Sequence, residues 1–116
     1  MSNVLVVGNL VTDPELRYTT GGSATASFTV CENRKRGDES EAHFYEVICW
    51  KKLAENVSES LTKGMRIIVN GQLQQRSWET PDGSKRSKVE IVAWQVGPSL
   101  EYASCEVTKN ARDDER

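Results

Sequence analysis

Alternation of hydrophobic and polar residues, together with short β-branched runs, predicts that most of this chain forms β-strands. Successive side chains of a strand point to opposite faces, so a period of two is typical of a half-buried strand. The stretches with this character, separated by Gly, Pro and Asp, are residues 3–12, 24–32, 44–50, 65–78 and 85–96. Residues 100–108 predict one further short strand.

One segment has the period of an amphipathic helix. Within residues 52–63, Leu53, Val57 and Leu61 recur every four positions, and a glycine follows as a C-terminal stop. Residues 33–43 have no apolar periodicity and divide into a basic and an acidic half, which predicts a long exposed hairpin loop.

Five substantial strands with a helix after the third have the element count of an OB-fold. Gly8 and Gly71 interrupt two of the strands, and glycine inside a strand is typical of a bend at a barrel corner. We therefore expect an all-β chain that forms a five-stranded Greek-key barrel with one short helix between strands 3 and 4.

The composition is that of one globular domain, with 116 residues of which 37% are hydrophobic and 28% charged. No apolar run approaches the roughly 20 residues of a membrane helix, and Asp13-Pro14 comes too early for a signal peptide, so a cytoplasmic protein is expected. The three cysteines are widely spaced and form no Cys-x-x-Cys pair, and we expect neither a metal nor a cofactor.

The strand predicted over residues 65–78 carries the most informative aromatic residue. One of its faces is the expected core and consists of Met65, Ile67, Val69, Gly71 and Leu73. Trp78 falls on the opposite, polar face with Arg76, and a large ring among cationic and amide side chains is what stacking on nucleic-acid bases requires. Packing over a sheet edge or in a subunit contact is the other interpretation.

The third strand leaves two interpretations open. If Tyr45, Val47 and Cys49 face the core, Phe44 and Trp50 lie outside and can stack on bases, with Lys51 and Lys52 adjacent for phosphates. If the faces are reversed, Phe44 and Trp50 are ordinary core residues.

Two short basic segments flank these aromatic residues. They are Arg34-Lys35-Arg36 in the expected loop and Lys85-Arg86, with Lys88 beyond. Basic hairpins beside an aromatic strand surface favour a groove that follows a phosphate backbone. Because the net charge is −2, any such attraction must be local, and the acidic residues near the first segment leave a solvated loop of mixed charge as the alternative.

A catalytic site finds little support. His43 is the only histidine, and no spacing supports Cys31 or Cys105 as a nucleophile. We expect a protein that is not an enzyme, with no catalytic residues.

Several motifs, in order, resemble the bacterial single-stranded DNA-binding protein family over about Asn3 to Val96. They are VLVVGNLVTDPELRYTTGGSATASFTV, Trp50-Lys51-Lys52-Leu53-Ala54-Glu55, Lys63-Gly64, and Val69-Asn70-Gly71-Gln72-Leu73 followed by Arg76-Ser77-Trp78. Residues 97–103, GPSLEYA, resemble the actinobacterial branch, in which an extra strand after the barrel clamps neighbouring subunits.

The resemblance implies an OB-fold homotetramer, associated with the nucleoid, around which single-stranded DNA wraps without catalysis. Residues 1–98 would form the DNA-binding domain, and residues 99–116 a C-terminal clamp-like strand and a polar tail. By position, Phe44, Trp50 and Trp78 match stacking aromatics, and Lys52, Lys63 and Arg76 match residues that meet phosphates. Tyr45 matches a subunit-interface position, and the clamp adds Tyr102 and Cys105 to the expected interface.

The chain departs from the family pattern at several places. Arg36 lies near a position where many relatives carry a stacking Trp, Glu46 stands where relatives often have a base, and Trp94 matches no familiar aromatic. In relatives, a Gly/Pro/Gln-rich linker and an acidic tip recruit replication and repair proteins. The sequence given ends at residues 113–116, DDER, without this linker and tip, so it does not decide whether such proteins are partners.

These observations favour a protein that binds and protects unpaired DNA, with little sequence preference, during replication, recombination and repair. The alternative is an OB-fold protein-interaction module with minor or lost DNA binding, which Glu46 and the near-zero net charge support. An odd cysteine count also permits pairing between subunits through Cys105, although reduced thiols are the expectation in a cytoplasm.

Overall fold

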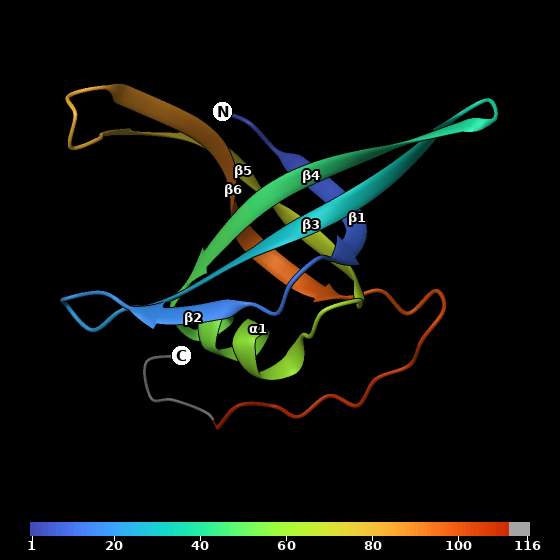
Figure 1. Cartoon of the computed structure of the whole chain (residues 1–116). Helices are drawn as coiled ribbons and strands as arrows, with labels where there is room; N and C mark the ends of the chain where they lie inside the picture. Colours follow the sequence, from blue (N-terminus) through green and yellow to red (C-terminus); the bar gives the residue numbers. More distant parts are fainter. Residues whose placement is uncertain (112–116) are drawn as a thin grey trace.

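The structure, a computed structural model that describes residues 1–111, is a β-barrel with a helix packed below it (Figure 1). The elements are β1 (Val4–Leu10), β2 (Glu15–Tyr18), β3 (Ala24–Arg36), β4 (Glu39–Trp50), α1 (Lys51–Ser60), β5 (Arg66–Glu79) and β6 (Lys85–Pro98). The strand order is β1-β5-β6-β4-β3-β2, and an additional pairing of β1 with β3 closes a barrel of β1, β3, β4, β5 and β6. The predicted OB-fold, with one helix after the third barrel strand, is confirmed.

The core lies inside the barrel and on the inner side of α1. One face of β3 is buried throughout, from Ala24 to Val30, as the alternation of residues 24–32 predicts. In β4, Val47 and Cys49 are buried, so the alternation of the strand turns Phe44, Glu46, Ile48 and Trp50 to the outer face. The helix adds Ala54 and Val57 to the core.

The core face predicted for residues 65–78 is right in the middle of β5 and wrong at both ends. Ile67 and Val69 are fully buried, whereas Met65 and Leu73 are exposed. Met65 precedes the strand, and Leu73 pairs with Ile91, the first residue of β6 that also pairs with β4. Beyond this pair, β5 and β6 continue as a projecting hairpin (Figure 1). Apolar alternation alone cannot show where a strand extends beyond its core.

The long loop predicted for residues 33–43 is wrong, because β3 and β4 stay paired up to Arg36 and Glu39. Only Gly37 and Asp38 separate the strands, and Gly37 has a φ of 62°, a conformation open to glycine without steric cost. A hairpin exposed on both faces needs no apolar period, because its backbone ladder and cross-strand polar pairs hold it. The β3–β4 and β5–β6 hairpins thus form two arms that diverge from the barrel (Figure 1).

The predicted C-terminal strand does not form in the single chain. Beyond β6, residues 99–111 have no strand and pass below α1, where the side-chain amides of Asn56 and Asn110 exchange hydrogen bonds of 2.7 and 3.1 Å. A strand needs a neighbouring ladder, and none of the strands in the described part of the chain pairs with this segment. The rest of the predicted tail, residues 112–116, lies outside the described residues.

The two glycines expected at bends both lie where backbones approach closely. Gly8 precedes Asn9, the residue at which β1 pairs with both β5 and β3. A Cβ on Gly8 would lie 2.4 Å from the carbonyl oxygen of Cys31, and one on Gly71 would lie 2.1 Å from that of Val92. The register of β5 against β6 also shifts between Asn70 and Gly71. Barrel closure therefore depends on the absence of side chains at these positions.

We predict that Gly71→Ala lowers the free energy of unfolding by about 1–3 kcal/mol, because the added methyl group meets rigid backbone and forces the strands apart. Urea denaturation followed by circular dichroism measures the change. Gly97→Ala is the matched control, since nothing lies within 4 Å of the place that its Cβ would take, and its stability should stay within about 0.5 kcal/mol of the parent. Equal stability of the two variants would contradict the close-approach argument.

Candidate nucleic-acid interface

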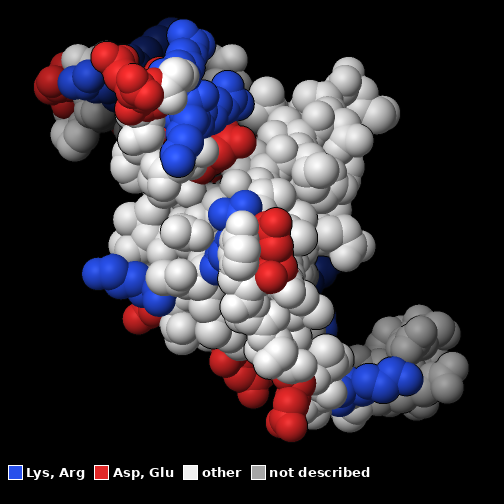
Figure 2. All heavy atoms as spheres, turned by 90° about the vertical axis from the view of Figure 1, so that its right-hand side faces the viewer, with Lys and Arg blue, Asp and Glu red and all other residues white. Residues whose placement is uncertain are grey.

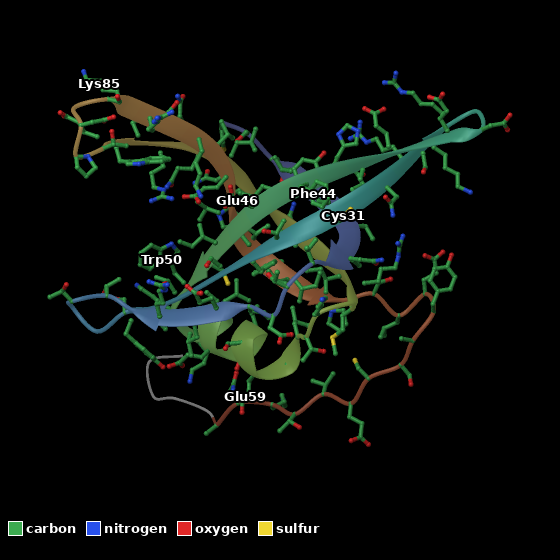
Figure 3. All side chains as sticks on the ribbon, in the orientation of Figure 1. Cys31, Phe44, Glu46, Trp50, Glu59 and Lys85 are labelled. Atoms are coloured by element: carbon green, nitrogen blue, oxygen red, sulfur yellow. The ribbon has the colours of Figure 1, made fainter. Side chains whose placement is uncertain are left out.

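The outer face of β4 presents two large aromatic side chains. Because Val47 and Cys49 point inward, Phe44 and Trp50 point outward, with 63% and 42% of their surfaces exposed. Figure 3 labels both residues along β4, with Glu46 between them. This geometry answers the question that the sequence left open, and excludes a core position for Phe44 and Trp50.

The β5–β6 arm presents a third aromatic residue among cations. Trp78 pairs in register with Arg86, and Arg76 pairs with Lys88, so these four side chains share one face of the arm. Trp78 is 41% exposed, and the guanidinium carbon of Arg76 lies 5.2 Å from the centroid of its ring, a cation–π distance. Lys85, at the arm tip in Figure 3, pairs with Glu79 on the opposite face.

Two ion pairs occupy the space between the arms. Lys88 Nζ lies 2.9 Å from Glu46 Oε1, and Arg76 Nε lies 3.5 Å from Glu90 Oε1. A groove of about 750 Å³ contains all four of these side chains and is also lined by Trp50. The groove therefore joins the outer face of β4 to the β5–β6 arm.

The structure divides the basic triplet of the β3–β4 arm. Lys35 pairs with Ser40 and shares a face with Phe44, whereas Arg34 and Arg36 lie on the other face. Arg34 Nε lies 3.2 Å from a Glu32 carboxylate oxygen, and Arg36 Nε lies 3.8 Å from one of Glu41. Figure 2, which looks onto this side of the molecule, shows basic and acidic side chains intermixed in its upper part. Only one cation of the triplet is thus on the aromatic face.

The remaining predicted basic residues flank α1. Lys52 lies in its first turn, with Nζ 3.2 Å from a Glu55 carboxylate oxygen. Lys63 follows the helix, and its backbone N–H donates a 2.8 Å hydrogen bond to Asp13. Neither residue lines the groove between the arms.

The residues predicted for subunit contacts differ in their surroundings. Tyr45 is half-buried against the core and its hydroxyl donates a 3.2 Å hydrogen bond to Glu32. Tyr102 and Cys105 are exposed in the segment after β6, and Arg66 lies 5.8 Å from the ring centroid of Tyr102.

Sequence reasoning placed Lys88 beside the second basic segment without naming it as a DNA-binding residue, and it did not assign Trp94 to a surface. Lys88 follows Arg86 by two positions, so the alternation of β6 was a sufficient signal for their shared face. Trp94 has no such signal. Asn70 pairs with Gln95 and the next residue, Gly71, pairs with Ala93, so Trp94 has no partner on β5 and forms a β-bulge. This bulge exposes Trp94 and Gln95 together, on the face that Leu5 and Ile68 also share.

The cysteines differ in accessibility, with Cys49 buried, Cys31 half-buried and Cys105 exposed. Loss of hydration in the core raises the pKa of the Cys49 thiol to about 11, although a hydrogen bond with the Ala26 backbone opposes the shift. Within residues 1–111, no group of three or more His, Cys, Asp or Glu side chains is arranged to hold a metal ion. In the same part of the chain, no helix is long and apolar enough to span a bilayer.

Comparison with known proteins finds one family and many relatives. Residues 1–99 match the Single-strand binding protein family. The relatives include proteins named Single-stranded DNA-binding protein from Corynebacterium glutamicum and Mycolicibacterium smegmatis, both 48% identical, and from Mycobacterium tuberculosis, 46% identical. Each alignment covers 96% of this chain, but 52% of the Corynebacterium protein and 72% of the other two. The chain therefore spans about half the length of the first of these relatives.

We predict that Cys49 resists alkylation in the folded protein at pH 8, whereas Cys105 reacts. A thiol with a raised pKa remains protonated well above pH 8, and the protonated form is a poor nucleophile. Iodoacetamide labelling followed by peptide mass spectrometry measures both sites, and labelling in denaturant supplies the control. Rapid modification of Cys49 without denaturant would contradict its buried position.

Proposed function

Because the chain belongs to the single-strand binding protein family, we propose that it binds single-stranded DNA with little sequence preference and protects it during replication, recombination and repair. The observation that carries the proposal is the exposure of Phe44, Trp50 and Trp78 on strand faces that also present cations. Aromatic platforms beside a positively charged path are the general means of holding unpaired nucleic acid. This is a binding function, with no reaction assigned.

Stacking supplies the preference for unpaired DNA. The rings of a duplex are already stacked on one another, so Phe44, Trp50 and Trp78 have no base face to contact there. Every base has a π-face, which makes such contacts tolerant of sequence. We estimate the contribution at about 1–3 kcal/mol per stacked base, the range found by alanine substitution in proteins of this type.

Cations near the rings supply phosphate contacts. We propose that Lys35, Arg76 and Arg86 act beside the aromatic faces, and that Lys52 and Lys63 extend the path around α1. Arg34, Arg36 and Lys85 point to the opposite faces of their arms and contribute less. Attraction to phosphates releases counterions from the DNA, so affinity should fall as salt rises.

We further propose that the protein is a homotetramer. The outer face of β1, β5 and β6 exposes Leu5, Ile68 and Trp94 with fractions of 67%, 39% and 46%, and an apolar face of this kind marks an interface. In the segment after β6, of which residues 99–111 are described, Tyr102 and Cys105 would add contacts, because this segment would gain a strand partner in a neighbouring subunit. Tyr45, within the domain of residues 1–98, would add a further contact. The proposed role requires a cytoplasmic protein associated with the nucleoid.

One observation favours a second candidate, a protein-interaction module with minor DNA binding. Lys88 and Arg76, two of the cations that line the groove, already have carboxylate partners. A module of this type would bind single-stranded DNA weakly or with little dependence on salt.

We predict that an unstructured thymidine oligonucleotide deeply quenches tryptophan fluorescence, whereas a duplex of equal length has little effect. Titrations at low and high salt measure the affinity and its salt dependence. Quenching by the single strand that weakens with salt supports the proposal, and little quenching by either ligand favours the interaction module.

Replacement of single tryptophans identifies the rings that report binding. Trp50→Phe and Trp78→Phe should each reduce the quenching, because both rings lie on the proposed DNA path. Trp94→Phe is the matched control and should preserve it, since Trp94 lies on the proposed subunit face. Loss of the signal only in Trp94→Phe would contradict the assignment of the faces.

We predict that the purified chain sediments with four times its 13.0 kDa mass and that Leu5→Lys dissociates the assembly. A buried lysine without a partner is costly, so it should break a contact made by this face. Analytical ultracentrifugation measures the mass, with Val89→Lys as the control because Val89 is exposed on the projecting β5–β6 arm. A monomeric parent chain, or an intact tetramer with Leu5→Lys, would refute the proposed interface.

A further inference from the structure

The candidate DNA path carries carboxylates as well as cations. Glu46 lies on the outer face of β4 between Phe44 and Trp50, and its side chain is 54% exposed (Figure 3). Its carboxylate oxygen is 2.9 Å from Lys88 Nζ, a shorter separation than the 3.5 Å between Arg76 and Glu90. A strand that stacks on both rings of β4 must therefore pass a negative charge.

The ion pair also links the two arms at the place where they separate. β4 pairs with β6 through Val47 with Ile91 and Ile48 with Val92, and Glu46 and Lys88 lie just beyond these pairs on the arm side. Lys88 in turn shares a face with Arg76 and Trp78. Phosphates that lead from Trp50 toward Trp78 would meet Lys88, whose charge is already neutralised.

Glu90 differs from Glu46 in the exposure of its side chain to solvent. Its side chain is 8% exposed, and its partner Arg76 compensates a carboxylate that is largely removed from water. Loss of that pair would leave a buried charge, so Glu90 is a structural partner. Glu46 has no such need, because its exposed carboxylate remains hydrated without Lys88.

We propose that Glu46 is a negative determinant of DNA affinity, an internal competitor that holds Lys88 until phosphate replaces it. The inference rests on the proposed function. When DNA binds, the Lys88 ammonium group leaves the carboxylate for a phosphate oxygen, and when DNA leaves, the ion pair forms again. The surface thus holds single strands less tightly than its aromatic residues and cations alone would allow.

The variant Glu46→Gln tests the proposal while retaining the size of the side chain. We expect its affinity for a fluorescently labelled thymidine oligonucleotide, measured by anisotropy, to rise about two- to fivefold, the range of an exposed ion pair. We expect the slope of log affinity against log salt to steepen by about 0.7, the value for one more phosphate contact on a single strand.

Two further variants separate a local effect from a change in net charge. Glu39→Gln alters the net charge equally but lies on the face of the β3–β4 arm opposite Phe44, where it pairs with Arg36, and should leave the affinity unchanged. If Glu39→Gln and Glu46→Gln raise the affinity equally, the proposal is wrong. In a Lys88→Gln background, Glu46→Gln should have a smaller effect, because the cation to be released is absent.

The outcomes distinguish this proposal from the proposed function. If the parent chain does not bind the oligonucleotide, the proposed function itself fails. If the parent binds and Glu46→Gln binds no better, the internal competitor is refuted and the function stands. An equal gain with and without Lys88 would also refute the exchange, since the carboxylate would then act only by repelling phosphate.

Discussion

Closure of the barrel is the constraint on which the functional surface depends. β1 pairs with both β5 and β3, and this closure requires close backbone approach at Gly8 and Gly71. Once the barrel is closed, one face of each strand is committed to the core, and the period of two commits the other face to solvent. Burial of Val47 and Cys49 therefore fixes the outward direction of Phe44 and Trp50.

The same closure explains why the arms can carry polar and aromatic residues on both faces. Where β3, β4, β5 and β6 extend beyond the barrel, the hairpins have no core of their own, and the backbone ladder and cross-strand polar pairs maintain them. Trp78 and Phe44 are therefore exposed, because they lie on parts of the hairpins that have no core to bury them. The arms diverge, so the groove at their base is the connection between the two aromatic surfaces.

The candidate DNA surface carries carboxylates as well as cations. The chain has a net charge of −2, and two cations of the surface, Arg76 and Lys88, have carboxylates beside them. A binding surface that retains its own counterions gains less from counterion release than one with uncompensated cations. Under the proposed function, this arrangement would give moderate affinity and ready exchange of strands.

Much of the fold and part of the site follow from the sequence itself. The buried face of β3, the helix, the glycines at close approaches and the polar surroundings of Trp78 are local signals, because side-chain period and turn chemistry act over a few residues. The direction of Phe44 and Trp50, the division of the basic triplet, the bulge at Trp94 and the Glu46–Lys88 pair needed the tertiary structure. Each depends on the register of strands far apart in the chain, and Glu46 and Lys88 are 42 residues apart. The segment after β6 shows the same limit, since a strand without a neighbour in its own chain has no ladder to join.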